Sequence, residues 1–323
     1  MIHRPPVDIS LRAQCQLQLE TFQQWIGLLQ QFHGQIEPYG QELLKDRHAL
    51  DTAKSNTDYQ KVLQTLQQHT ASIQLPALKN EASYQLQQLT SSADSWGQAH
   101  PYHDDYNNKT YHMGYEYGPD GMAGWVQDEL NSAKTITDYQ QAIKDANISL
   151  THFQAYQDNA QDTTPWSSPH QTDLQLMRHY QVATQKVVVI SLKEQALRVY
   201  NNGDLVKAFH VTTGRPEKPS LPGFWSVESK RSPTVFRSDQ PPGSPYWYPD
   251  TPIQYAMLYH SGGYFLHDSW WRADYGPNTQ FPHYDSSGDA FSFDGSHGCI
   301  NIASGKAAWV FNYVDINTPV IIY

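Results

Sequence analysis

The sequence is poor in cysteine, in long apolar runs and in clustered positive charge. Only two cysteines occur in 323 residues, which leaves no framework of disulfide bonds. No apolar run reaches membrane-spanning length. Lys and Arg number 22 against 32 Asp and Glu, a net charge of −10 without a basic cluster, so nucleic acid and anionic lipid are not expected partners. The length allows two domains, each with its own core.

Metal-binding patterns are also missing. The sequence contains neither a His-Glu-x-x-His motif nor paired cysteines at zinc-ligand spacing. The acidic segment 285–289 lacks the ligand spacing of a calcium loop, so we interpret it as a solvated loop. We therefore predict no metal site.

The first half of the chain has the pattern of a helical domain. From about residue 8 to residue 163 it is rich in Gln, Leu and Ala, with apolar residues at helical spacing. We expect a break at Gly34 and at 38–40, a second helix from near Gln41 and a third that Thr57 caps. Cys15 lies at helical spacing with apolar neighbours, which predicts a buried position in the first helix.

A short segment recurs in this half. Residues 53–60 and 133–140 share six of eight positions at an offset of 80, which predicts an internal duplication of a helical unit. The stretch 96–124 between the copies is rich in Tyr, His, Gly and Asp, and we expect an irregular connection. Its tyrosines could stack on sugar rings or pack a long loop, so a spacer and a ligand-binding module both stay open.

The second half has a different composition. Pro and Ser near residues 163–169 predict a linker over 164–183 with one short helix at 172–180, between a helical domain at 1–163 and a domain at 184–323 that folds alone. Strands are expected at 187–190, 197–200, 205–213, 226–228, 254–259, 264–267 and 320–323. Asn202-Gly203 predicts a hairpin turn, and Ser304 is expected to cap a late helix. The predicted fold class is α+β, with the second domain mainly β.

The stretch Ser296-His297-Gly298-Cys299-Ile300-Asn301 has the strongest chemical pattern. A thiol is a useful nucleophile only as the thiolate, so it needs a neighbour that takes its proton. Gly298 lets substrate and main chain approach closely because it has no Cβ. A lone cysteine is more often a small buried apolar residue, but these neighbours favour a nucleophile.

These six residues resemble the Ser/Thr-His-Gly-Cys-aliphatic-Asn/Arg signature of the L,D-transpeptidase catalytic domain, the YkuD-type fold. The resemblance covers roughly Lys186 to Tyr323. The strands that open the domain, Gly214, and the run 221–225 are also similar to that family, although Pro222-Gly223 only approximates its Thr-Pro-x-Gly turn. His267 and His297 are 30 positions apart, more than is usual in the family, so Ser269 to Gly295 is interpreted as an insertion that forms a lid.

The resemblance implies roles for the residues around Cys299. His267, which follows Phe265-Leu266, matches the family's general base, and His260 and His283 are the alternatives. Asp268 stands where a main-chain carbonyl often orients the base; its carboxylate could strengthen that role or face solvent. His297, Gly298 and the Cys299 amide would shape the oxyanion hole, while Ser296 and Asn301 brace the loop. Substrate contacts are assigned to Tyr255, Trp270 and Trp271.

The implied function is that of a cysteine acyltransferase, an L,D-transpeptidase that cross-links peptidoglycan. Cys299 would attack tetrapeptide stems and pass the acyl group to an amine of a second stem, without metal or organic cofactor, and carbapenems would acylate it. The implied process is cell-wall biogenesis, which maintains cell shape. An L,D-carboxypeptidase or hydrolase on the same stems, and a wall-binding protein with an unused site, are the alternatives.

The expected location is extracytoplasmic, in the cell wall or periplasm. Met1-Ile2-His3-Arg4-Pro5-Pro6 is not followed by the apolar stretch of a signal peptide, which taken alone indicates the cytoplasm. The implied substrate lies outside the membrane. We therefore expect an export signal or anchor that this sequence does not contain, and no membrane contact within this chain. The sequence does not predict an oligomeric state.

Overall fold

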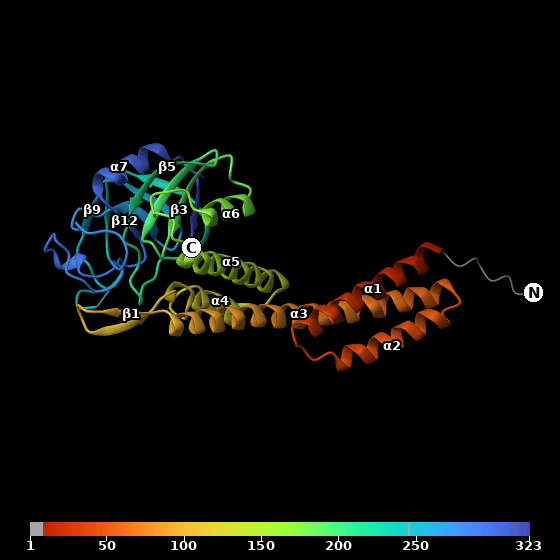
Figure 1. Ribbon diagram of the computed structural model, residues 1–323. Coiled ribbons are helices and arrows are strands. Elements are labelled where there is room, and N and C mark those ends of the chain that lie inside the picture. Colours follow the sequence, from red (N-terminus) through yellow and green to blue (C-terminus); the bar gives the residue numbers. More distant parts are fainter. Residues whose placement is uncertain (1–8, 245) are drawn as a thin grey trace, which may run out of the picture. The chain divides into compact units, whose positions relative to one another are not determined.

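The computed structural model describes residues 9–244 and 246–323. The chain forms two compact units, one from Met1–Gln88 and Val126–Asn147 and the other from Leu89–Trp125 and Ile148–Tyr323. Helices come first and a mainly β domain follows (Figure 1), so the predicted α+β class is confirmed. Among the described residues no helix is long and apolar enough to cross a membrane. The expected helix start near residue 8 and the segment Met1–Pro6 lie outside the described residues.

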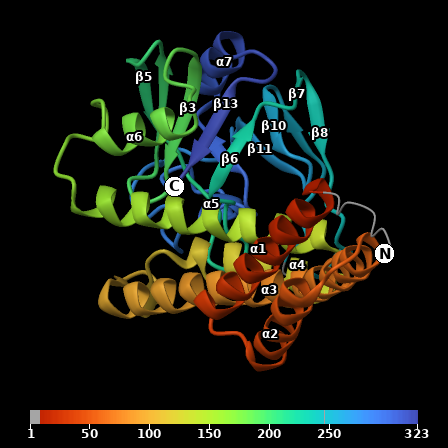
Figure 2. The same ribbon diagram turned by 90° about the vertical axis from the view of Figure 1, so that its right-hand side faces the viewer.

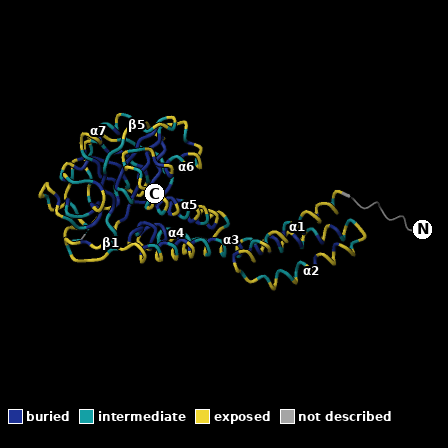
Figure 3. The backbone as a smooth tube through the Cα atoms, viewed as in Figure 1, coloured by how far each residue is buried: buried dark blue, intermediate teal, exposed yellow. Residues whose placement is uncertain are grey.

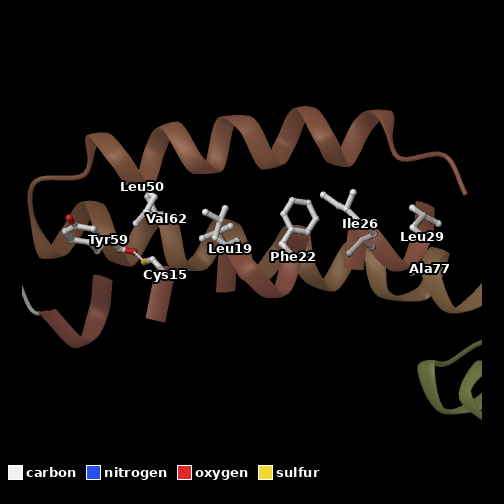
Figure 4. Close-up of a cluster of buried hydrophobic side chains, with 11 residues drawn as sticks. Cys15, Leu19, Phe22, Ile26, Leu29, Leu50, Tyr59, Val62 and Ala77 are labelled. Atoms are coloured by element: carbon white, nitrogen blue, oxygen red, sulfur yellow. Dashed lines mark hydrogen bonds between the residues drawn. The ribbon is translucent and has the colours of Figure 1, made fainter. Parts of the chain in front are cut away.

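Three helices build the first core of the first unit. They are α1 (Ile9–Gln31), α2 (Glu37–Thr52) and the beginning of α3 (Asn56–Ala99), which lie side by side in Figure 1. Figure 4 shows their shared apolar cluster, made of Cys15, Leu19, Phe22, Ile26, Leu29, Leu50, Tyr59, Val62, Leu66, Ile73 and Ala77. Cys15 is fully buried, which confirms the predicted core position, and its Sγ donates to the Tyr59 carbonyl at 3.3 Å.

The second core of this unit lies between α3 and the later helices α4 (Met122–Ser132) and α5 (Ile136–Gln161). Its buried members are Leu78, Ala82, Tyr139 and Ala142. The expected break is found at Gly34, between α1 and α2, but not at 38–40, because α2 begins at Glu37 and contains these residues. Pro38 is tolerated there because the first turn of a helix needs no amide donor at that position.

The two repeated segments form the same local structure. Ser55 Oγ accepts from the Asp58 amide at 3.2 Å, and Thr135 Oγ1 accepts from the Asp138 amide at 3.2 Å. Each Asp carboxylate accepts in return from two preceding amides, so each segment is a capping box at a helix start. The predicted cap, Thr57, is wrong: α3 begins at Asn56 and Ser55 caps it. The internal duplication stays a prediction.

Two main sheets form the second unit. The first has the order β5 (Asp204–His210), β4 (Ala196–Asn201), β3 (Lys186–Ser191), β13 (Pro319–Ile322), β6 (Gly223–Ser226). The second has the order β12 (Ile300–Ile302), β11 (Tyr264–Asp268), β10 (Ala256–His260), β7 (Ser229–Arg231). Two smaller hairpins pair β1 (Pro101–Asp104) with β2 (Lys109–His112) and β8 (Thr234–Phe236) with β9 (Thr251–Ile253). In Figure 3 the main strands are largely dark blue, that is, buried.

Most predicted strands of this unit are found, with shifted ends. The strand expected at 226–228 lies at β6, earlier in the chain. The turn at Asn202-Gly203 is confirmed, since both residues have positive φ, at 51° and 83°, as a type I′ hairpin turn requires. The late helix, α7 (Ser304–Tyr313), begins where predicted, but no side chain caps it.

The expected linker is part of the second unit's core. Helix α6 (Gln171–His179) and the end of α5 lie along the first sheet (Figure 2), and Leu176, Met177 and Ala155 pack with its buried side chains. Buried Asp173 of α6 forms an ion pair with buried Arg198 of β4, and His152 of α5 hydrogen-bonds through Nδ1 to the Ile322 carbonyl at 2.6 Å. The structure therefore divides the chain elsewhere than at 163 and 184.

The connection at 96–124 is more regular than expected. Helix α3 continues to Ala99, and the β1–β2 hairpin and the short 3-10 helix η1 (Tyr115–Tyr117) follow. Three tyrosines that had two open interpretations, Tyr102, Tyr111 and Tyr115, pack around the fully buried ring of Phe281, at ring-centroid distances of 4.6, 4.9 and 5.8 Å. These three rings pack a loop.

Candidate active site

Cys299 lies immediately before β12, in a loop that its own hydrogen bonds hold. Ser296 Oγ donates to the Cys299 carbonyl at 2.5 Å and accepts from the Gly298 amide at 3.1 Å. The main chain of Ser296 also pairs with the segment around Gly214. Ser296 thus lies where a residue that braces the loop would lie.

Gly298 has a conformation that other residues avoid. Its φ is +102°, and a Cβ placed on it would lie 2.7 Å from Tyr264 Cε1 and 3.2 Å from the Pro219 carbonyl oxygen. A side chain here would force either the tyrosine or the loop to move. Glycine is therefore required for the path of the main chain as well as for access to Cys299.

The Cys299 thiol is half-buried in apolar surroundings. It packs against the cluster of Ile253, Ala256 and Phe265, and its Sγ lies 3.7 Å from the Gly263 carbonyl oxygen, to which it donates. Shielding from water raises the pKa of the thiol to about 11, because burial disfavours the charged thiolate. At neutral pH Cys299 is a thiol.

His267 lies on β11, which pairs with β12 in parallel. Its Nδ1 donates to the Asp268 main-chain carbonyl at 2.8 Å, so the neutral ring carries its proton on Nδ1 and has its lone pair on Nε2. Asn301, opposite His267 in the register, donates through Nδ2 to that Nε2 at 3.2 Å. Burial lowers the pKa of His267, which keeps the ring neutral and able to accept a proton.

The Asp268 carboxylate does not face solvent, and its support of the His267 role stays a prediction, since its charge raises the pKa of His267. The side chain is buried, and its Oδ1 accepts from the Tyr255 amide at 2.6 Å. The group that orients His267 is the main-chain carbonyl of Asp268. The carboxylate instead connects the end of β11 to the residue before β10.

His267 lies on β11 and Cys299 directly precedes the adjacent strand β12, but the two side chains are not hydrogen-bonded to each other. Leu266 pairs with Ile300, the residue after Cys299. Within the described residues no hydrogen bond joins Sγ to the imidazole, since His267 Nε2 is occupied by Asn301. Catalytic hydrogen bonds are often long in free enzymes and tighten only with substrate.

His297 lies on the other side of Gly298 and contacts positive charge. Its Nε2 accepts from Arg215 Nη2 at 2.9 Å, and the Tyr248 ring lies 5.7 Å away, centroid to centroid. Shielding by its neighbours, together with the charges of Arg215 and Lys218, lowers the pKa of His297 to about 4. The ring is therefore neutral, with its proton on Nδ1, where it can donate.

The remaining predicted residues lie at different distances from this centre. Trp271 is near it, with its ring 6.0 Å from that of His267. Trp270 packs edge-on against Trp271, is 58% exposed and donates to the Pro252 carbonyl. Tyr255 packs on Phe311 of α7, at 5.4 Å between ring centroids.

The two alternative bases have other surroundings. His260 lies among three aromatic rings, those of Trp125, Trp225 and Tyr264, at 5.0, 4.8 and 5.8 Å. His283 donates to the Phe281 carbonyl and lies in the insertion. The assignment of His267 as the base stays a prediction.

The insertion at 269–295 is anchored at several points. Buried Asp285 accepts from the amides of Ala273 and Asp274 at 3.0 Å each, and buried Arg272 donates to two main-chain carbonyls near the 3-10 helix η2 (Ala290–Ser292). Phe281 is core. A lid over the site stays a prediction, and at least this central part of the loop is fixed in place.

Four residues near the site were missed by the sequence analysis. Arg215 and Lys218 follow Gly214 on a loop beside the cysteine, and Tyr246 and Tyr248 come from the segment between β8 and β9. Two cations at positions 215 and 218, just after the strand that ends at His210, in an acidic chain, were the available signal. No metal cluster of three or more His, Cys, Asp or Glu side chains occurs among the described residues.

Comparisons with known proteins point to one family. L,D-transpeptidase 1 of Mycobacterium tuberculosis is 25% identical over 149 residues, 45% of this chain and 53% of that protein. The probable L,D-transpeptidase 3 of the same species is 31% identical over 113 residues, 34% of this chain and 36% of that protein. The chain thus spans about half the length of the first of these relatives.

Solved structures give the same family name. One, described as L,D-transpeptidase 3 from Mycobacterium tuberculosis in complex with a faropenem-derived adduct, is 24% identical with a TM-score of 0.33 and covers 42% of this chain and 59% of that one. The family model of the L,D-transpeptidase catalytic domain, YkuD, matches residues 185–322, which include Cys299 and His267. Residues 185–322 of this chain therefore match the family of YkuD-type L,D-transpeptidase catalytic domains.

Proposed function

We propose that this chain is an L,D-transpeptidase that uses Cys299 to cross-link peptidoglycan stem peptides. The observation that carries the proposal is the family match over residues 185–322, together with a half-buried thiol directly before β12 and a neutral imidazole on the adjacent strand β11. Peptidoglycan lies outside the cytoplasmic membrane, so we place the reaction there.

In the first step the Cys299 sulfur attacks the carbonyl carbon of the third residue of a tetrapeptide stem. A C–S bond forms and the C–N bond to the terminal D-residue breaks. His267 Nε2 takes the thiol proton and delivers it to the leaving amine. Because the thiol pKa is about 11, the proton is removed as the sulfur attacks. His267 Nε2 can accept this proton only after its hydrogen bond from Asn301 has broken.

In the second step an amine of another stem attacks the thioester. Its C–N bond forms as the C–S bond breaks, and His267 returns the amine's proton to the sulfur. The Cys299 amide and the Nδ1–H of His297 are the donors that we assign to the oxyanion. Water in place of the amine would make the same site an L,D-carboxypeptidase.

The test incubates the purified protein with a tetrapeptide stem and identifies products by mass spectrometry. We expect cross-linked dimers and the released D-residue from the wild type and neither from Cys299→Ala. Tripeptide without dimer would assign the carboxypeptidase activity instead. No product in either case would contradict both assignments.

A carbapenem gives an independent readout of the nucleophile, because its strained carbonyl meets the same thiol. We expect one adduct on the intact protein, lost in Cys299→Ala and kept in Cys15→Ala, since Cys15 is fully buried in the helical unit. An adduct that survives Cys299→Ala would contradict the assignment of the nucleophile.

A further inference from the structure

The loop from Arg215 to Ser220 is fixed against the cysteine loop. The Arg215 amide donates to the Ser296 carbonyl at 3.0 Å, and Ser220 Oγ donates to the Gly298 carbonyl at 2.8 Å. A Cβ on Gly295 would lie 2.7 Å from the Arg215 nitrogen, so the two main chains are in direct contact. Side chains of this loop therefore have a defined position beside Cys299.

Two cations of this loop lie near the same tyrosine. The Lys218 amide donates to the Arg215 carbonyl at 2.9 Å, which makes a turn. The Arg215 guanidinium lies 5.5 Å and the Lys218 ammonium 4.8 Å from the centroid of the Tyr246 ring. Arg215 also donates to His297, two residues before the nucleophile.

The charge at this position is only partly compensated. Asp294 lies 3.5 Å from Arg215 Nη1 and compensates part of the Arg215 charge; burial raises the pKa of Asp294, and Arg215 lowers it. Glu217 is on the same loop, and its charge acts on Asp294 and Tyr111. Within the described residues no carboxylate oxygen lies within 4.0 Å of the Lys218 ammonium. The pKa of His297 is lowered partly by both cations, which shows that His297 faces a positive field.

We propose that Arg215, Lys218 and Tyr246 form a subsite that binds a free carboxylate of the donor stem peptide. The inference rests on the proposed function and names the group by which that site selects its substrate. In a tetrapeptide stem the residue that leaves carries its α-carboxylate directly beside the scissile amide. A carboxylate on the third residue's side chain is the other source of the same chemistry. Arg binds either one through paired N–H donors.

The experiment combines substitutions in the protein with amidation of the peptide. Three tetrapeptide stems are compared: one with all carboxylates free, one amidated at its C-terminus and one amidated at the third residue's side chain. For each, kcat/KM is measured with the wild type, Lys218→Gln and the double variant Arg215→Gln/Lys218→Gln. Lys207→Gln is the matched control, because Lys207 lies on β5 over the Trp309 ring.

We expect amidation of the bound carboxylate to lower the wild-type kcat/KM about 10- to 100-fold, the usual effect of losing a charged hydrogen bond. In the double variant, kcat/KM for the unmodified stem should fall to the value that the wild type shows with the amidated stem. Amidation should not lower it further. Amidation should lower kcat/KM less in Lys218→Gln than in the wild type, and by the full wild-type factor in Lys207→Gln. The position at which amidation lowers kcat/KM identifies the carboxylate that is bound.

Equal amidation penalties in the wild type and the double variant would overturn the subsite while leaving the proposed function intact. The subsite would also be overturned if neither amidation lowered the kcat/KM of the wild type. Failure of the wild type to process any stem would overturn the proposed function, and the subsite with it.

Discussion

At the scale of single residues, the proposed nucleophile, Cys299, and its proposed base, His267, are both held uncharged. Burial raises the pKa of Cys299 and lowers that of His267, so a resting thiolate–imidazolium pair is disfavoured in both partners. Such a thiol reacts only when the base removes its proton during the attack. The pH dependence of acylation should therefore reveal the base.

We expect carbapenem acylation by the wild type to rise as pH increases through the lowered pKa of His267 and to change little near neutral pH. In His267→Ala the rate should fall about 10²- to 10⁴-fold at pH 7. It should then climb about tenfold per pH unit towards the thiol pKa of about 11, because only the thiolate fraction reacts. Rates come from intact-protein mass spectrometry at several pH values.

His260→Ala is the control for this profile. It removes a histidine that lies 5.8 Å from Tyr264, ring to ring, and it should keep the wild-type plateau. If the acylation rate near neutral pH stayed constant with pH in His267→Ala but not in His260→Ala, His260 would be the base.

The second prediction at this scale concerns Gly298→Ala. The new Cβ would meet Tyr264 and Pro219 at a positive φ, so we expect acylation to fall at least about tenfold and stability to fall by about 1–3 kcal/mol. Gly305→Ala, on α7 with open space around it, should be neutral or stabilise by up to about 1 kcal/mol. Thermal denaturation and acylation rates measure both variants. Full activity in Gly298→Ala would show that the loop accepts a side chain.

At the scale of elements, α6 is held to the first sheet by charge as well as by apolar contact. Asp173 accepts from Arg198 and from the hydroxyl of Tyr200, at 2.5 and 2.6 Å, and from the hydroxyl of Tyr323. All four side chains are fully buried. Removing the Asp173 carboxylate leaves Arg198 with Glu194 as its remaining ionic partner, at 2.6 Å, and deprives three buried side chains of their shared acceptor.

We therefore expect Asp173→Ala to lower the free energy of unfolding by about 3–5 kcal/mol. Gln175→Ala on the exposed side of the same helix should change it by about 0.5 kcal/mol or less. Chemical denaturation of both variants measures the difference. A loss below about 1 kcal/mol in Asp173→Ala would mean that Arg198 finds another partner.

Strands were easier to predict than the contacts between distant segments. Runs such as Val187-Val188-Val189-Ile190 are buried on both faces, and their composition predicts a strand by itself. The role of Asp173 is invisible in sequence, because its partner Arg198 lies 25 positions away and local periodicity says nothing about it. In the same way the six-residue signature predicts Cys299, whereas Arg215 enters the site only through the fold.

At the scale of the whole molecule, the unit that holds Cys299 is larger than the segment that resembles the family. It includes residues 89–125 and the end of α5, and Tyr115 donates to the Gly214 carbonyl at 2.6 Å, directly before the loop of Arg215. The expectation that residues 184–323 fold alone stays a prediction, and these contacts argue against it. The composition of the sequence changes at the Pro and Ser residues near 163–169, but the second unit continues across this segment.

We expect a fragment of residues 182–323 to be insoluble or unable to react with a carbapenem, because it leaves Arg198 without Asp173 and exposes the apolar face that α6 covers. The full chain treated in parallel is the control. Solubility, circular dichroism and adduct formation are the measurements. A soluble fragment acylated at the rate of the full chain would show that the added helices are dispensable.

The position of β13 has a consequence for how the protein is made. This strand lies between β3 and β6, yet it follows every other strand of the described structure. Until residues 319–322 have left the ribosome, β3 has an open edge on which another chain could pair. Cys299 and His267 are both synthesised before the sheet that supports their unit can close. A chain interrupted just before Pro319 would therefore already contain Cys299 and His267 while the edge of β3 is still open and prone to aggregation.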